Sequence, residues 1–260
     1  MNTSLSRWLA TWTKFLRAGW DFIYPPACLV CGSGLPAPEL KQQATAHFCQ
    51  DCRQKLTLHV DHPSCLRCGA PLGPYVDLRR GCPECRHDKF AFQTVYRLGV
   101  YDGAVREAVI SGKYLGGEPL LVSLAELIWE HAGEQMRQAG IDLVVPIPQH
   151  WRQRLMTRHH APDILAEAWG RSLRVPVGYP ILAKSRWTRK QARLNRTERH
   201  RNQHQVFRVT RPTKVKGRTI LLVDDVLTTG ATAHSAARAL KAAGAKAVVV
   251  AVIARVLGHH

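Results

Sequence analysis

The chain lacks the features that mark a membrane-spanning or exported protein. Its 260 residues contain no continuous apolar run long enough to cross a bilayer. There is no compact apolar stretch with a small-residue cleavage site, so no signal peptide is expected. Low-complexity segments are absent too, and the only repeat is a set of paired cysteines. The cytoplasm is therefore the expected location.

Acidic residues are scarce: the chain has 19 Asp and Glu against 37 Lys and Arg, a formal net charge of +18. The imbalance is concentrated in residues 150–218, which hold 18 Lys or Arg and three acids. Such a segment forms a solvated basic surface, neutralises a pyrophosphate-bearing substrate, or binds nucleic acid. Trp151 and Trp187 lie within it, where they could stack on the bases of single-stranded DNA. Burial of both tryptophans is the plainer alternative.

No cysteine stands alone, because all eight fall into C-x-x-C pairs. Two such turns complete a tetrahedral zinc site, and the intervening 17 and 13 residues are close to zinc-ribbon spacing. The sequence therefore predicts two structural Zn²⁺ ions. In the simplest, sequential pairing, the first ion is bound by Cys28, Cys31, Cys49 and Cys52, and the second by Cys65, Cys68, Cys82 and Cys85. Cross-braced pairing stays open. Disulfides would need an oxidising compartment, and redox-active pairs usually occur singly.

Residues 220–232 carry the most informative pattern in the chain. Four apolar residues predict a buried parallel strand, and Asp224 and Asp225 follow where that strand ends. The next residues lead into a predicted helix and are rich in hydroxyls: Thr228, Thr229, Gly230, Ala231 and Thr232. A turn of this kind offers N–H groups and hydroxyls to a phosphate, and paired carboxylates accept hydrogen bonds from sugar hydroxyls. The pattern favours a ribose 5-phosphate site, although a capped strand-to-helix turn is the plainer reading.

Beyond the cysteines, strands and helices alternate. Strands are predicted at 92–101, 141–148, 218–223 and 247–254, and helices at 103–114, 119–138, 163–173 and 231–243. This order predicts an α/β fold, with a parallel sheet covered by helices on both faces. Residues 184–204 are predicted to form a long mobile loop.

The predicted organisation has three parts. Residues 1–24 form an amphipathic helix that docks on the chain's own core, on a partner, or on a membrane surface. Residues 25–90 form a double zinc ribbon, and residues 91–260 form the α/β domain.

The stretch 220–232 resembles the motif of the type I phosphoribosyltransferases, which bind 5-phosphoribosyl 1-diphosphate (PRPP). Together with the cysteine pairs, it makes the chain similar to the ComF family of competence-associated proteins. Weaker shared positions are Pro25, Pro26, Tyr101, Gly103, Arg106, Pro146, Pro148, Gln191, Arg199, Asn202 and Phe207. The resemblance implies a type I phosphoribosyltransferase-like domain behind a zinc module, with a link to DNA uptake and DNA-uptake proteins.

The resemblance also implies roles for individual residues. Asp224 and Asp225 would hold the ribose hydroxyls, residues 228–232 would wrap the 5-phosphate, and Lys113 would contact the diphosphate. The cations of the family's flexible loop would fold over the departing pyrophosphate: Arg186, Arg189, Lys190 and Arg193. Arg152 and Arg154 are weaker diphosphate candidates, for which a surface position is the better expectation. Mg²⁺ would bind with PRPP, through diphosphate oxygens and water.

Two functions follow from the resemblance. The chain is a phosphoribosyltransferase that displaces pyrophosphate from PRPP, or it is a non-catalytic PRPP or nucleotide sensor or single-stranded-DNA-binding protein. One departure bears on this choice. The family's Arg-Gly-aromatic-Asn-Gln run reads here as residues 158–162, Arg-His-His-Ala-Pro. The loss of its glycine alters either the diphosphate contact or only the entry to a helix.

Overall fold

The computed structural model describes residues 26–35, 47–60, 62–76, 82–148, 160–184 and 206–258. The chain forms two compact units, residues 1–53 and residues 54–260. The helix predicted at 1–24 and nearly all of the loop predicted at 184–204 lie outside the described residues. Among the described helices, none is long and apolar enough to cross a membrane.

The first unit is built around a cysteine turn. The Gly32 N–H donates to the Cys28 carbonyl at 2.8 Å, and Gly32 has a φ of 73°, which a residue without a side chain adopts at low cost. Cys49 precedes helix α3 (Gln50–Thr57), whose first turn carries Cys52. Leu35 and the buried thiols of Cys28 and Cys52 form a small apolar cluster. This cluster is far smaller than the core of a self-sufficient domain.

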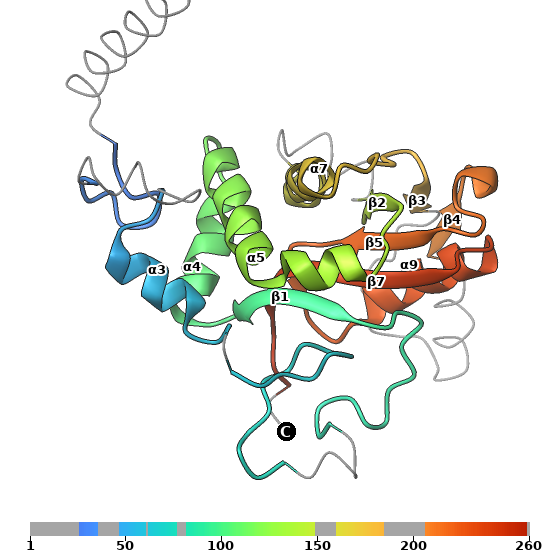
Figure 1. Cartoon of the computed structure of the whole chain (residues 1–260), viewed down its shortest axis with the longest axis horizontal. Coiled ribbons are helices and arrows are strands. Elements are labelled where there is room, and N and C mark those ends of the chain that lie inside the picture. Colours follow the sequence, from blue (N-terminus) through green and yellow to red (C-terminus); the bar gives the residue numbers. More distant parts are fainter. Residues whose placement is uncertain are drawn as a thin grey trace, which may run out of the picture. The chain divides into compact units, whose positions relative to one another are not determined.

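The second unit contains a parallel sheet (Figure 1). Its strand order is β1-β7-β5-β2, and every pairing is parallel. The strands are β1 (Val95–Val100), β7 (Ala247–Arg255), β5 (Thr219–Val223) and β2 (Leu143–Pro146). The two-residue strand β6 (Val226–Leu227) continues the β5 register along β7. All five residues of β5 are buried, as the unbroken apolar run predicted.

Helices pack against both faces of this sheet. Ile220, Leu222 and Val250 share an apolar cluster with Ala236 and Leu240 of α9. Side chains alternate along a strand, so Leu221 and Val249 point to the opposite face, where the other helices lie. The helices are α4 (Gly103–Gly112), α5 (Glu118–Gln138), α7 (Ala161–Leu173) and α9 (Ala231–Ala242). The predicted α/β fold is confirmed.

An antiparallel hairpin was missed by the sequence analysis. Strands β3 (Leu182–Lys184) and β4 (Phe207–Val209) pair with Leu182 opposite Val209, and a 3₁₀ turn follows at η3 (Pro212–Lys214). Each strand has only three residues, too few for a period-two pattern to stand out. The hairpin brings together the two ends of the segment predicted as a loop.

Candidate functional site

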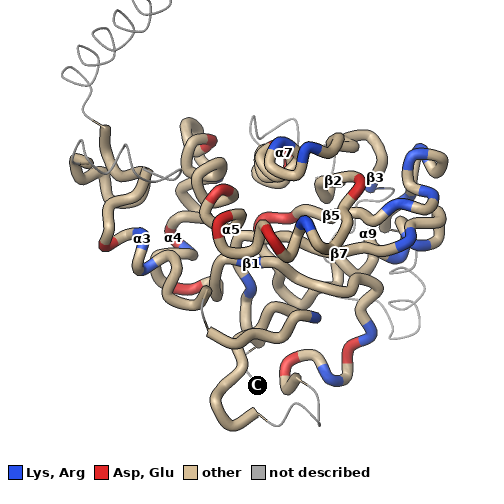
Figure 2. The backbone as a smooth tube through the Cα atoms, in the orientation of Figure 1, with Lys and Arg blue, Asp and Glu red and all other residues tan. Residues whose placement is uncertain are grey.

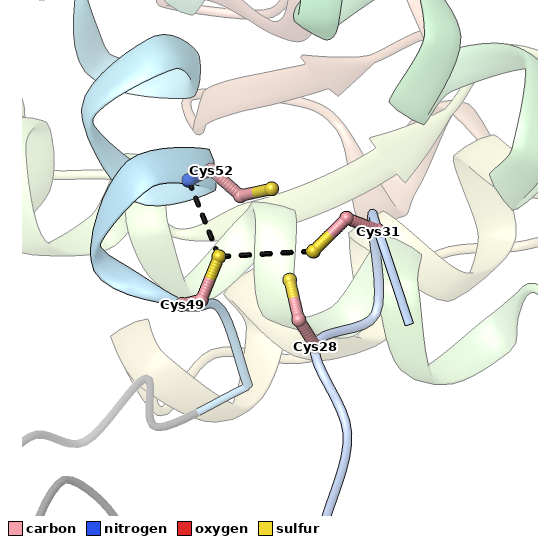
Figure 3. Close-up of side chains that lie close together, drawn as sticks. All are labelled: Cys28, Cys31, Cys49 and Cys52. Atoms are coloured by element: carbon pink, nitrogen blue, oxygen red, sulfur yellow. Dashed lines mark hydrogen bonds between the residues drawn. The ribbon is translucent and has the colours of Figure 1, made fainter. Parts of the chain in front are cut away.

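The first zinc cluster consists of Cys28, Cys31, Cys49 and Cys52 (Figure 3). Their four Sγ atoms lie within 4.8 Å of one another, and the Sγ atoms of Cys31 and Cys49 are 3.7 Å apart. The Cys52 N–H donates to Cys49 Sγ at 3.5 Å, and the Ser33 hydroxyl lies 3.0 Å from Cys31 Sγ. The first turn of α3 therefore directs a backbone N–H toward one sulfur of the cluster.

The second zinc cluster consists of Cys65, Cys68, Cys82 and Cys85, and it lies in the second unit. The Sγ atoms of Cys65 and Cys85 are 3.8 Å apart, and those of Cys68 and Cys82 are 3.7 Å apart. The tight turn closes through the Gly69 N–H, which donates to the Cys65 carbonyl at 2.7 Å. Burial raises the pKa of the Cys85 thiol to about 12 and also raises that of Cys68. Buried thiolates crowded together need a cation to offset their charge.

The sulfur geometry fits zinc. Four Zn–S bonds of about 2.3 Å in a tetrahedron place the sulfur atoms about 3.8 Å apart. A disulfide would bring them to about 2.0 Å, and all eight cysteines are free. The grouping is sequential, not cross-braced. Because each cluster supplies four protein ligands, the ions would be closed to substrate and would stabilise the fold.

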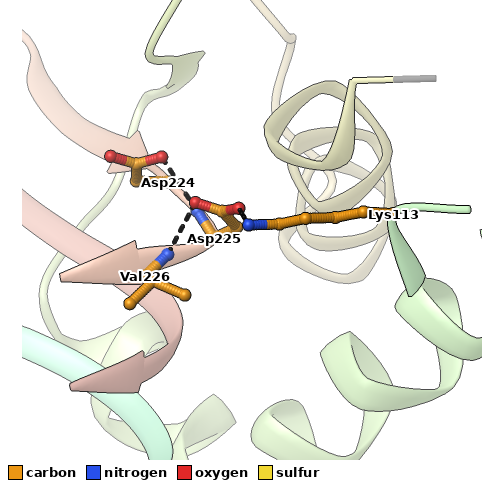
Figure 4. A network of polar contacts seen from close by, with 4 residues as sticks. All are labelled: Lys113, Asp224, Asp225 and Val226. Carbon is orange, nitrogen blue, oxygen red and sulfur yellow. Dashed lines mark hydrogen bonds and ion pairs between the residues drawn. The ribbon is translucent and has the colours of Figure 1, made fainter. Parts of the chain in front are cut away.

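Asp224 and Asp225, the acidic pair, lie between β5 and β6 at the carboxyl end of the sheet (Figure 4). The Asp225 N–H donates to Asp224 Oδ1 at 3.0 Å, and the Val226 N–H donates to Asp225 Oδ1 at 2.8 Å. Lys113, which follows α4, places its Nζ 2.5 Å from Asp225 Oδ2. The structure thus brings together three residues that the sequence analysis singled out separately.

The two carboxylates have different electrostatic environments. Desolvation raises the pKa of Asp224 well above its usual range, and the charge of Asp225 raises it further, whereas Lys113 opposes the shift. Asp225 is 20% exposed and pairs directly with the ammonium of Lys113, which is 48% exposed. Asp224 is therefore the carboxyl group of the pair that retains its proton to higher pH than an ordinary aspartate.

Residues 228–232, named the phosphate loop after their predicted role, follow β6 and include the first two residues of α9. Gly230 is the N-cap of α9, with a φ of 77° that favours glycine. The Ala231 N–H donates to Thr229 Oγ1 at 3.3 Å, while Thr228, Thr229 and Thr232 are exposed. The first N–H groups of a helix have no acceptor within it, and they carry the positive end of its dipole. The loop has the form of an anion-binding helix start.

Several predicted site residues lie outside the described part of the chain. These are Arg152, Arg154, Arg158, His159, Arg186, Arg189, Lys190 and Arg193. In the stretch 158–162, where the sequence differs from the family's motif, the described residues begin at His160. His160 is the N-cap of α7, and its Nδ1 lies 2.9 Å from Asp163 Oδ1. Pro162 occupies the first turn of that helix, so residues 160–162 match the helix-entry alternative.

Sequence analysis assigned no role to three residues that lie in or against the phosphate loop and its helix. Arg255 is 5% exposed and donates through Nη1 to the Leu227 carbonyl at 3.2 Å. Phe90 packs against Gly230, and His234 accepts a hydrogen bond at Nδ1 from the Ala91 N–H at 3.1 Å. The available signal was Arg255 itself, a charge at the end of an apolar strand, where a buried cation needs specific partners.

Comparison with known proteins agrees with this architecture. A double zinc ribbon domain matches residues 19–87, and a phosphoribosyl transferase domain matches residues 172–258. The chain is 26% identical to the DNA utilization protein YhgH of Escherichia coli K12, over 90% of this chain and 98% of that protein. It is 22% identical to competence protein F of Haemophilus influenzae, covering 80% of this chain and 90% of that one. It is 26% identical to competence protein ComFC of Bacillus subtilis, over 77% of this chain and 80% of that protein.

Among solved structures, a Bacillus subtilis glutamine PRPP amidotransferase complexed with ADP and GMP aligns with a TM-score of 0.37. The alignment covers 55% of this chain and 30% of that one, at 17% identity. The domain pair and the named relatives confirm the resemblance to the ComF family.

Native mass spectrometry is expected to find two zinc ions per chain. Cys31→Ser and Cys68→Ser should each lose one ion, since each removes one of four ligands from a different cluster. Cys68→Ser should also lower the melting temperature of the second unit, because structural zinc contributes directly to folding. A metal-free chain whose mass under non-reducing conditions shows disulfides would contradict the assignment, and Ser33→Ala is the control that keeps all eight thiols.

Asp224→Asn is expected to stabilise the protein at neutral pH. Folding raises the pKa of Asp224, so the folded state binds its proton more tightly, and the ionised carboxylate lowers the free energy of unfolding above that pKa. The gain over wild type should be fully present at pH 8. It should shrink as the pH falls below the raised pKa and vanish at about pH 3, where the folded and unfolded carboxyls are both mostly protonated.

Thermal unfolding of both proteins between about pH 3 and pH 8 measures this difference. Glu107→Gln, which removes an exposed carboxylate on α4, is the control and should show no comparable gain. An Asp224→Asn protein less stable than wild type at pH 8 would show that the ionised carboxylate is stabilised by its surroundings.

Proposed function

We propose that the acidic pair and the phosphate loop bind the ribose 5-phosphate portion of Mg²⁺–PRPP or of a nucleotide. The observation that carries the proposal is their order along the chain: a buried strand, two carboxylates at its carboxyl end, and a hydroxyl-rich turn that opens a helix. Ligands of parallel α/β sheets bind at this end of the strands. The phosphoribosyl transferase match over residues 172–258 supports the same segment.

The roles within the site follow from its electrostatics. Asp225, paired with Lys113, would accept a hydrogen bond from one ribose hydroxyl. Asp224, with its raised pKa, would hold the neighbouring hydroxyl and can act as donor or acceptor according to its protonation. The exposed hydroxyls of Thr228, Thr229 and Thr232 and the first N–H groups of α9 would surround the 5-phosphate.

Lys113 would change partner when the ligand arrives. Its ammonium is half exposed and has the reach of a long flexible side chain, so a diphosphate can compete with Asp225 for it. Mg²⁺ would bind to diphosphate oxygens and water, as this ion prefers. Arg186 and Arg189, in the segment that joins β3 to β4, are proposed to add charge over the diphosphate.

Turnover would follow from the same contacts. A nitrogen of the acceptor would displace pyrophosphate from the anomeric carbon, and positioning and charge stabilisation would supply the catalysis. No covalent nucleophile is required. A sensor that binds PRPP without an acceptor uses the same site, so binding is tested first and pyrophosphate release second.

The test is calorimetric titration of Mg²⁺–PRPP into the zinc-loaded chain. Wild type should bind one ligand per chain, and Asp224→Asn/Asp225→Asn should abolish detectable binding, while Glu107→Gln keeps the wild-type affinity. Lys113→Met should weaken binding by about tenfold, a typical effect of losing one charge-assisted contact. Thermal unfolding of the double variant makes loss of binding separable from loss of folding. Absence of binding by folded, zinc-loaded wild type would overturn the proposal.

A second candidate function is single-stranded DNA binding. The relatives named for DNA utilization and competence favour it, and so does the charge distribution. Figure 2 shows Lys and Arg gathered near β4 and the end of α9. The exposed cations of this region include Arg208, Arg211, Lys214, Lys216, Arg238 and Lys246. With reduced thiols as metal ligands, the cytoplasm is the proposed location of either function.

Salt dependence distinguishes the two ligands. Affinity for a labelled oligo-dT, followed by fluorescence anisotropy, should fall steeply with salt, with a log–log slope of about −0.7 per phosphate contact. Arg211→Glu/Lys214→Glu should reduce the slope by about 1.4 if both residues contact phosphates. Arg137→Glu/Arg171→Glu makes the same change of net charge on α5 and α7. Equal losses in the two variants would indicate a non-specific charge effect and contradict a binding path near β4.

A further inference from the structure

The end of β7 joins the second zinc cluster to the phosphate loop through one side chain. Arg255 is buried, and its Nε donates to the carbonyl of the zinc ligand Cys68 at 3.1 Å. Its Nη1 donates to the Leu227 carbonyl at 3.2 Å and also to the carbonyls of Thr228 and Val256. One guanidinium therefore contacts a residue that holds the metal and the first residue of the phosphate loop.

A second contact joins the same two parts. Phe90, five residues after the last ligand of the second cluster, packs on that cluster and stacks on Phe92 with ring centroids 4.6 Å apart. A Cβ added at Gly230 would lie 2.8 Å from Phe90 Cε1, so the ring closely covers the loop glycine. The neighbouring Ala91 N–H donates to His234 Nδ1 on the first turns of α9.

The turn from Cys65 to Gly69 in the second cluster is hydrogen-bonded to strand β1 as well as to β7. Arg97 of β1 donates through Nε to the Gly69 carbonyl, and β1 pairs with β7. Two arginines on adjacent strands therefore fix the carbonyls of consecutive residues, Cys68 and Gly69. A zinc ion bound by four thiolates carries net negative charge, which the buried guanidinium of Arg255 and the half-buried one of Arg97 would offset.

We infer that the second zinc cluster sets the conformation of the phosphate loop through Arg255, which is a positioning residue for the ligand. The inference rests on the proposed function for its consequence, since a loop held in place binds a 5-phosphate more tightly than one that must be ordered first. The inference gives the second cluster a role that the first does not have. Zinc bound at the second cluster would support ligand binding through Arg255 and Phe90. Its readouts are loop order and ligand affinity, beyond any turnover.

Position 255 requires arginine because its side chain donates hydrogen bonds to carbonyls on two separate segments of the chain. A guanidinium presents five N–H donors in a rigid planar fork, and Nε and Nη1 here reach carbonyls on two different segments. A lysine keeps the positive charge but concentrates its donors at one point, so it cannot satisfy both segments at once. Arg255→Lys therefore changes the link between cluster and loop with little change in volume or charge.

The experiment compares wild type, Arg255→Lys and Arg137→Lys as full-length, zinc-loaded chains. Arg137 is an exposed arginine on α5 and serves as the matched control. Native mass spectrometry first verifies two zinc ions in each chain. Hydrogen exchange then follows the amides of residues 227–233, and calorimetry follows Mg²⁺–PRPP affinity. Arg255→Lys should exchange these amides faster and bind PRPP at least about tenfold more weakly, as expected when charged hydrogen bonds are lost.

The outcomes separate this inference from the proposed function. Wild-type loop exchange in Arg255→Lys overturns the inference, whatever the PRPP result. Faster exchange with no PRPP binding by wild type supports the link and refutes the proposed ligand. Faster exchange with unchanged affinity would also overturn Arg255 as a positioning residue. If Arg255→Lys loses zinc or fails to fold, Phe90→Leu tests the second contact with the same two measurements, without altering a buried charge.

Discussion

The parallel pairing of β5 with β7 is the constraint on which the candidate site depends. The Asp224 N–H donates to the Ala251 carbonyl at 3.1 Å, and the Ile253 N–H donates to the Asp225 carbonyl at 2.9 Å. The backbone of the acidic pair is therefore hydrogen-bonded to β7, as are β5 before it and β6 after it. The carboxylates extend from a backbone that β7 fixes on one side. Side chains on such a frame lose little freedom when a ligand binds, which lowers the cost of recognition.

This frame also explains why the two aspartates differ. Asp224 follows the five buried residues of β5 directly, and desolvation raises its pKa, whereas Asp225 points toward Lys113. Adjacent carboxylates cannot both ionise without cost in a poorly solvated place. The raised pKa of Asp224 reflects that cost, and perturbed pKa values of this kind cluster at functional sites.

The sequence predicted the sheet, its helices, both cysteine clusters and the acidic pair, because each rests on a local pattern. An unbroken apolar run such as residues 220–223 has few alternatives, and C-x-x-C spacing confines two thiols to one turn. Lys113 was singled out through a resemblance, but its contact with Asp225 spans more than a hundred residues, and no local pattern specifies that. The hairpin of β3 and β4 was missed because three-residue strands carry no readable period.

The two cysteine clusters also show that a local pattern does not specify contacts between residues distant in sequence. Their sequence patterns are nearly alike, yet the first packs with Leu35 and Val30 in a cluster of its own, and the second is fastened to the sheet by Arg97 and Arg255. Arg255 is buried and Arg97 is half-buried, and their hydrogen bonds to the Cys68 and Gly69 carbonyls constrain the backbone of the second cluster. The C-x-x-C spacing specifies a metal site. Arg255, which lies far from the cysteines in sequence, determines that the second cluster shares a buried contact with the phosphate loop beside the acidic pair.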